Sequence, residues 1–213
     1  MTGFSTRCWR KDGSRAAAWA ERVLQLVLAV LCLGWPPALR AEPLEIDQVE
    51  LARTEEGLLL SASLRLELPP AADEALSKGI PLFFVADTVL LRERWYWYDQ
   101  EIASAERHLR LSYQPLTRRW RLVASNGPIG NPGLALGQTF DTREEALAAV
   151  QRISGWKIAE PGEAQPDRAY TVNFSFRLDV SQLPRPFQIG IAGQPEWNLS
   201  AARSLQLPAR GGR

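Results

Sequence analysis

Two eleven-residue stretches of this chain alternate between apolar and polar side chains. In the first stretch the apolar positions are Leu58, Leu60, Ala62, Leu64, Leu66 and Leu68. In the second stretch they are Tyr170, Val172, Phe174, Phe176, Leu178 and Val180. A period of two places alternate side chains on opposite faces of a strand, and this pattern is typical of antiparallel strands with one face buried. The two stretches therefore predict antiparallel sheet that is covered on one face.

The first 41 residues differ from the rest of the chain. A segment with five Lys and Arg precedes Val23–Leu33, an almost unbroken apolar run of 11 residues. That length is typical of the apolar region of a signal peptide and is shorter than the ~20 residues that span a bilayer. We expect residues 1–41 to be a signal peptide cut after Ala41, or an N-terminal anchor that is not cleaved. Contact with the membrane is expected only through an uncleaved leader.

The charge and the cysteines change when the leader is removed. The leader holds six of the 25 Lys and Arg and two of the 24 Asp and Glu, so residues 42–213 have a formal charge of −3. Nucleic-acid binding normally needs a basic face, so we expect no nucleic-acid partner. Both cysteines, Cys8 and Cys32, lie in the leader, and the remaining chain must depend on its hydrophobic core. We expect a single β-rich domain over residues 42–207 and a disordered tail over 208–213.

Further strands are expected around one long hairpin. Leu82–Val85 and Val89–Leu91 are apolar on both faces, as in a central strand. One straight strand from Leu82 to Tyr98 would run about 55 Å, at roughly 3.3 Å per residue, so we expect a bend near Asp87–Thr88 or Arg92–Glu93. Arg107–Tyr113 completes the hairpin, with Leu109, Leu111 and Tyr113 facing inward and His108, Arg110 and Ser112 facing outward. Shorter strands are expected at Ile46–Leu51, Trp120–Ala124 and Phe187–Ile191.

Two short helices complete the expected elements. Asp73–Lys78 is expected to be one or two helical turns closed by Gly79, a residue suited to the position after a helix. Thr142 and Glu145 form a capping box, and the apolar residues that follow at helical spacing predict a helix over 142–154. The glycine-rich segment 125–138 has no Lys and no Ser or Thr at the spacing of a phosphate loop, so we interpret it as a surface loop.

These elements predict a mainly β fold. An antiparallel two-sheet sandwich with one or two short helices accounts best for the strand pattern, and an immunoglobulin-like arrangement is one form that it could take. The alternative is a single curled sheet that packs against the 142–154 helix.

Few residues could carry catalysis. His108 is the only histidine, and a triad would need it together with Ser104 or Ser112 and with Asp99 or Glu106. An outward-facing histidine on a strand is usually a surface residue, and no nucleophile signature surrounds it.

Carboxylates could pair across the hairpin, Glu93 with Glu101 or Asp99 with Glu106, as in glycosidases. They are equally well explained as solvated charges beside neighbouring arginines. Because the domain has one histidine and no cysteine, we expect no metal site. We also expect no cofactor and no enzyme activity.

The best candidate binding residues are consecutive: Arg94, Trp95, Tyr96, Trp97 and Tyr98. In a strand the two tryptophans share one face and the two tyrosines share the other. One aromatic pair can pack in the core while the other stacks on arginine or meets a partner. The alternative is that both pairs are packing residues.

Several motifs occur along the chain in a characteristic order: Gly79–Phe84, Arg94–Asp99, Leu111–Arg118, Phe140–Thr142, Leu183–Phe187 and Trp197–Ser200. With these motifs the chain resembles the proteobacterial domain of unknown function 4390 family over residues 44–204. The resemblance implies an exported, periplasmic protein without assigned catalytic residues, so no site residue is transferred. Members are often encoded beside a membrane sensor kinase of the nitrogen-regulation type, and the resemblance therefore implies an accessory role.

We expect a periplasmic, non-enzymatic interaction or accessory domain whose candidate partner is an inner-membrane sensor protein. The alternatives are a small-ligand carrier with a pocket between its sheets and a carboxylate-dependent hydrolase. The sequence predicts no oligomeric state.

Overall fold

The computed structural model describes residues 43–92, 99–129, 137–191 and 193–209. The chain separates into two units, Met1–Ala41 and Glu42–Arg213, and all described residues lie in the second unit. In chain order the elements are β1 (Leu44–Thr54), β2 (Gly57–Leu66), α2 (Pro70–Ser77), β3 (Leu82–Arg92), β4 (Gln100–Gln114), β5 (Arg119–Ser125), β6 (Gly137–Phe140), α3 (Arg143–Val150), β7 (Arg152–Ala159), β8 (Tyr170–Leu178), η1 (Val180–Gln182), α4 (Arg185–Ile191), η2 (Pro195–Trp197) and β9 (Ser200–Leu207).

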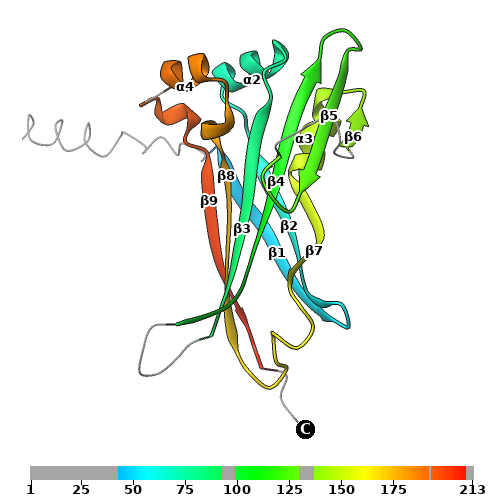
Figure 1. Cartoon of the computed structure of the whole chain (residues 1–213), viewed down its shortest axis with the longest axis vertical. Coiled ribbons are helices and arrows are strands. Elements are labelled where there is room, and N and C mark those ends of the chain that lie inside the picture. Colours follow the sequence, from blue (N-terminus) through cyan, green and yellow to red (C-terminus); the bar gives the residue numbers. More distant parts are fainter. Residues whose placement is uncertain (1–42, 93–98, 130–136, 192, 210–213) are drawn as a thin grey trace, which may run out of the picture. The chain divides into compact units, whose positions relative to one another are not determined.

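The described strands form two antiparallel sheets (Figure 1). Sheet A has the order β1-β2-β7, and sheet B has the order β6-β5-β4-β3-β8-β9. The predicted hairpin is the β3–β4 pair at the centre of sheet B. The mainly β, two-sheet antiparallel architecture is therefore confirmed, and the immunoglobulin-like form stays a prediction.

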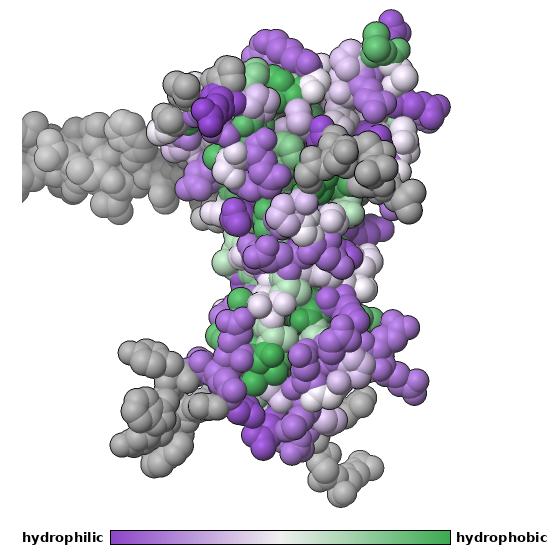
Figure 2. Space-filling model, in the orientation of Figure 1, coloured by the Kyte–Doolittle hydropathy of each residue, from purple (hydrophilic) through white to green (hydrophobic). Residues whose placement is uncertain are grey.

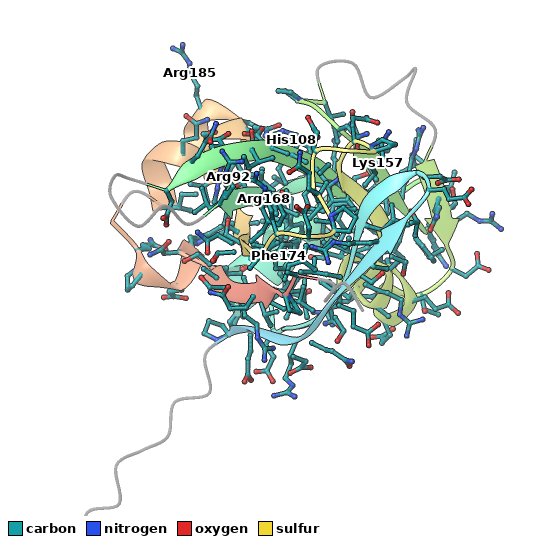
Figure 3. All side chains as sticks on the ribbon, turned by 90° about the horizontal axis from the view of Figure 1, so that it is seen from below. Arg92, His108, Lys157, Arg168, Phe174 and Arg185 are labelled. Carbon is teal, nitrogen blue, oxygen red and sulfur yellow. The ribbon has the colours of Figure 1, made fainter. Side chains whose placement is uncertain are left out.

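The hydrophobic core lies between the inner faces of the two sheets. β2 and β8 bury alternate residues, as their sequences predict. On β8 the ring of Phe176 stacks on Phe84 of β3 with centroids 5.7 Å apart. Figure 3 shows Phe174 among the side chains at the centre of the domain, whereas Arg185 projects away from the ribbon. Burial of these large rings is the main source of stability for a domain that has no cysteine.

Sheet A is narrower than sheet B. The part of the inner face of sheet B that sheet A does not cover packs against the helix α3. At one side β1 lies next to β9, and Arg203 of β9 donates hydrogen bonds to the carbonyls of Ile46 and Asp47. At the other side sheet A ends at β7, which lies against β3 and β4. β5 and β6 extend beyond β7, and α3 packs on them instead (Figure 1).

The helix predicted over 142–154 is shorter than expected. Its start is confirmed, because the Oγ1 of Thr142 accepts a hydrogen bond from the Glu145 N–H at 3.2 Å. The helix ends at Val150. Ile153 already belongs to β7, where it pairs with Ala62 of β2. Ile153 is apolar and lies three residues after Val150, so its position fits a helix as well as a strand. Only the pairing with β2 distinguishes the two.

The C-terminal elements also differ from prediction. Phe187–Ile191 belongs to the helix α4 and not to a strand. The Phe187 N–H bonds to the Pro184 carbonyl, and a proline near the start of a helix is favourable because its missing N–H would be unpaired there. Three strands, β6, β7 and β9, were not expected. The first residues of β7 were assigned to the helix over 142–154. β6 and β9 are edge strands with few apolar residues, so they lack the alternation that reveals a half-buried strand.

Of the two predicted positions for a bend in the central strand, Asp87–Thr88 was wrong, and Arg92–Glu93 lies at the end of the described part of the strand. β3 pairs with β4 and β8 without interruption through Asp87 and Thr88, and the register shifts only between Leu90 and Leu91. Gly79 follows α2 with φ +86°, which confirms its predicted role after that helix. Within the described part of the chain, no helix is long and apolar enough to cross a bilayer.

Candidate functional site

The predicted binding residues Arg94, Trp95, Tyr96, Trp97 and Tyr98 lie outside the described residues, and so does Glu93. They belong to the connection between β3 and β4, whose last described pair joins Arg92 to Gln100. Their role as a binding surface stays a prediction.

His108 lies on the outer face of sheet B but is only 8% exposed, so the expectation of a surface histidine was wrong. Its Nε2 is 3.3 Å from the Oε2 of Glu106, and its buried Nδ1 has no hydrogen-bond partner within the described part of the chain. Directly opposite His108 the register places Val85 on β3 and Ser125 on β5.

The structure does not assemble the predicted triad. Ser104 and Ser112 lie four residues before and after His108, which is about 13 Å along a strand at roughly 3.3 Å per residue. Ser112 donates its hydroxyl hydrogen bond to the carbonyl of Arg121. Sequence reasoning missed Ser125, which only the strand register brings beside His108. No hydrogen bond joins these two described residues, and the buried Nδ1 cannot reach a substrate.

Of the predicted carboxylate pairs, Asp99 with Glu106 is not brought together, whereas Glu93 with Glu101 includes a residue outside the described ones and stays a prediction. Glu106 contacts His108, while Asp99 and Glu101 are exposed at the other end of β4. Among the described residues, no group of three or more His, Cys, Asp or Glu side chains could hold a metal ion.

A bulge in β7 shapes the inner face of the domain. Ser154 and Gly155 together stand opposite Ser61, because Ile153 pairs with Ala62 and Trp156 pairs with Leu60. Gly155 has φ +56° and donates its N–H to the Oγ of Ser61 at 3.1 Å. The extra residue changes the alternation, so that Ile153 and Trp156 both point into the core, 3% and 2% exposed.

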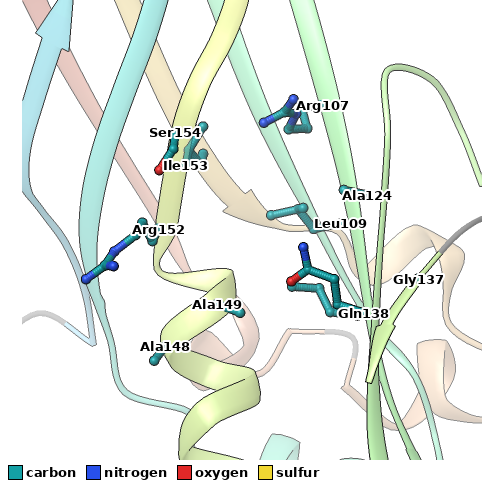
Figure 4. Close-up of a pocket in the computed structure, with 11 residues that line it drawn as sticks. Arg107, Leu109, Ala124, Gly137, Gln138, Ala148, Ala149, Arg152, Ile153 and Ser154 are labelled. Atoms are coloured by element: carbon teal, nitrogen blue, oxygen red, sulfur yellow. The ribbon is translucent and has the colours of Figure 1, made fainter. Parts of the chain in front are cut away.

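The bulge borders a cavity of about 700 Å³ at the position where sheet A ends and α3 begins (Figure 4). One wall is the inner face of sheet B, formed by Arg107, Leu109, Leu122, Ala124, Gly137 and Gln138. The other wall comes from α3 and β7 and is formed by Ala148, Ala149, Arg152, Ile153 and Ser154. Small side chains on α3 and β5 leave this space unfilled.

Arg107 is the charged residue that faces this cavity. It has the same phase on β4 as the buried Leu109 and Leu111, so it points inward from sheet B. Its Cζ lies over the ring of Trp156, 5.6 Å from the centroid. Burial lowers the pKa of the Arg107 guanidinium, which nevertheless stays charged at neutral pH.

Two other polar residues at the cavity have different orientations. Gln138 is opposite Leu122 in the β5–β6 register, so the two side chains share the inner face, and Figure 4 shows the Gln138 amide at the cavity. Arg152 pairs with Ser63, whose side chain lies on the outer face of sheet A. In Figure 4 the Arg152 guanidinium accordingly points away from the cavity.

The outer surface offers weaker candidates. Figure 2 shows one face of the domain, on which hydrophobic residues form separate patches among hydrophilic ones. The large apolar side chains that are exposed in the described residues are Leu116, in the β4–β5 turn, and Phe187, in α4. Single exposed apolar residues are normal on a protein surface. The cavity is therefore the strongest candidate site in the described part of the chain.

Comparison with known proteins identifies a family. No curated protein and no solved structure matches the chain. A family model described as "Domain of unknown function (DUF4390)" matches residues 41–206, from a position just before β1 to the penultimate residue of β9. This span agrees with the resemblance seen in the motifs, and the chain belongs to the domain of unknown function 4390 (DUF4390) family.

Proposed function

We propose that this protein is a non-enzymatic accessory domain of the periplasm that binds a small ligand between its two sheets. The cavity between β4–β5–β6 and α3–β7 is the observation that supports this function. Its volume of about 700 Å³ lies in the range of small-molecule sites, roughly 300–1,000 Å³. Sites of that class combine an apolar lining with a few polar groups, as this cavity does.

The walls of the cavity belong to regular elements. Leu109 and Leu122 are buried in paired strands of sheet B, and Ile153 is buried in β7. A ligand would therefore enter a site that the fold has largely formed, and little conformational entropy would be lost on binding. A carrier or ligand-sensing role needs such a site and needs no reactive side chain.

The periplasmic location and the accessory role are supported by the leader and by the family resemblance. In this proposal an inner-membrane sensor protein is the partner, and the β3–β4 connection that contains Trp97 and Tyr98 is the candidate contact. β4 begins at Gln100, immediately after that connection, and carries Arg107 in its middle. One strand therefore joins the candidate contact to the ligand cavity. A photo-crosslinker placed at Trp97 should capture an integral inner-membrane protein, and capture of periplasmic proteins alone would refute this contact.

The ligand-binding function is tested by screening the full chain against a panel of small carboxylates, amines, alcohols and amides. We expect at least one compound to raise the melting temperature and to appear in native mass spectra with one molecule bound. Ala149→Trp would fill the cavity from α3, because Ala149 lines it and is only partly buried. This variant should keep its own melting temperature within a few degrees of the parent and lose the response to the compound.

Ala52→Trp is the matched control, because Ala52 is exposed on β1 and lies outside the cavity. It should bind as the parent does. If Ala149→Trp does not fold, Ala124→Leu narrows the same cavity from β5. The proposal fails if no compound of the panel binds, or if binding survives in a folded variant with a filled cavity.

A further inference from the structure

Arg107 is a partly buried cation without an anionic partner among the described residues. Its guanidinium contacts the Trp156 ring, and it makes no hydrogen bond or ion pair with the described chain. Partial burial removes part of the hydration of this cation, and an aromatic face compensates for that loss only in part. The guanidinium has five N–H donors, and contact with a ring face leaves donors at its edge available.

Several other arginines of the domain have polar partners, whereas Arg110 on the outer face of sheet B resembles Arg107 in lying over a ring, that of Phe83. Arg177 lies 3.5 Å from a carboxylate oxygen of Asp87, and Arg143 lies 2.6 Å from one of Asp73. Arg203 donates to two carbonyls of β1. Arg107 is on the inner face, where a charge is most costly, and it lacks a comparable partner in the described part of the chain.

The lining of the cavity indicates what would complete this pairing. Its described lining residues include two arginines and no Asp or Glu. Because Arg152 points to the outer face of sheet A, Arg107 supplies the charge inside. The Gln138 amide adds a donor on the same wall. The other lining residues are mostly apolar, and Leu109, Leu122 and Ile153 are the buried ones among them.

We infer that the cavity binds an organic carboxylate, whose acid group pairs with Arg107 and whose apolar body lies on Leu109, Leu122 and Ile153. This inference rests on the proposed ligand-binding function and specifies its ligand class. One inward cation matches one negative charge, which favours a carboxylate over a doubly charged phosphate monoester. Arginine and carboxylate are also geometrically matched, because two parallel N–H···O bonds can form between them.

Octanoate, octanamide and octylammonium are suitable probes because they share one apolar body and differ in charge. Calorimetric titration of the full chain should show octanoate binding at least tenfold more tightly than octanamide, since hydrogen bonds to charged groups contribute enough for a factor of about 10 or more. Octylammonium should bind more weakly still. Arg107→Gln should weaken octanoate binding by about tenfold or more and leave octanamide binding within about twofold.

Arg185→Gln is the matched control for Arg107→Gln. It removes the same charge from an exposed residue that lies outside the cavity and projects away from the ribbon (Figure 3), and it should leave octanoate binding within about twofold. If Arg107→Gln does not fold, the relative affinities of the parent protein for the three probes test whether the cavity selects a carboxylate.

The possible failures are distinguishable. If no compound of the full panel binds, the proposed function itself fails. If octanamide or octylammonium binds as tightly as octanoate, the cavity is a ligand site that does not select an anion, and the inference is overturned while the proposed function stands. The same conclusion follows if Arg107→Gln and Arg185→Gln weaken octanoate binding equally.

Discussion

The bulge at Ser154 and Gly155 predicts a measurable backbone effect of one glycine. Gly155 has φ +56°, and a Cβ added there would meet no atom within 4 Å. Gly155→Ala therefore introduces no clash, and its effect is conformational. A left-handed backbone costs an L-residue roughly 1–2 kcal/mol. The lower entropy of the unfolded alanine chain offsets about 0.4–1 kcal/mol of this cost.

Gly127→Ala separates these two contributions. Gly127 is also free of neighbours within 4 Å, and its φ is not in the left-handed region. That variant should be neutral or stabilised by about 0.4–1 kcal/mol. The difference between the two variants then isolates the left-handed penalty of roughly 1–2 kcal/mol. Asparagine tolerates this conformation better than alanine, so Gly155→Asn should be the more stable variant at that position.

The assay is urea unfolding followed by tryptophan fluorescence, because Trp156 follows the bulge directly and is buried. Unchanged m-values would show that the compactness of the unfolded state is the same in all variants. Equal stability of Gly155→Ala and Gly127→Ala would refute the reasoning, since it would mean that Gly155 needs no left-handed backbone. In that case the left-handed conformation at Gly155 would not be what allows both Ile153 and Trp156 to point inward.

Two further predictions concern the ends of helices. Thr142→Ala removes the side chain that caps α3 and should destabilise the domain by about 1 kcal/mol in urea unfolding. Thr142→Ser keeps the hydroxyl, and its stability should lie within a few tenths of a kcal/mol of the parent. Equal losses of stability in both variants would show that the hydroxyl is not the cap. Desolvation raises the pKa of Asp179, but hydrogen bonds from Ser181 and Gln182 and the charge of Arg177 outweigh it, so the pKa of the folded state lies below the ordinary value of 3.8. A carboxyl with a depressed pKa contributes stability above its unfolded-state pKa, and this contribution is lost as pH falls through the folded value. Asp179→Asn should therefore lower the free energy of unfolding at pH 7 and make progressively less difference below about pH 3.8, and a pH-independent difference would contradict this linkage.

The sequence predicts the parts of this fold in which local pattern and tertiary burial agree. β2 and β8 alternate because one of their faces lies on the core, and the Thr142 hydroxyl caps α3 by accepting a hydrogen bond from the N–H three residues later. Both signals are contained in a short segment. Their structures could therefore be expected before any long-range pairing was known.

The elements that were missed depend on partners far away in the chain. β9 has apolar residues only at scattered positions, and its strand conformation comes from pairing with β8, as in Val172 opposite Leu205. Ile153 fits the helical spacing of α3 and belongs to a strand only because β2 is available to pair with it. His108 has the expected phase, but its burial comes from neighbours on β3 and β5. Local spacing contains none of this information.

The candidate site likewise combines a feature that the sequence contains with a feature that depends on long-range pairing. The phase of Arg107 was available in the sequence, because it lies two residues before Leu109 on a strand whose inward side was assigned correctly. A cation in phase with core residues is a stronger signal of a ligand than four consecutive aromatics, since aromatics are favourable in a core and an unpaired charge is not. The sequence could not show why Arg107 has space beside it. That space exists because sheet A ends at β7 while sheet B continues through β5 and β6, and because α3 covers the remainder with alanines. Two sheets of unequal width thus leave a junction, and a charged residue at such a junction is where a small anionic ligand can be held.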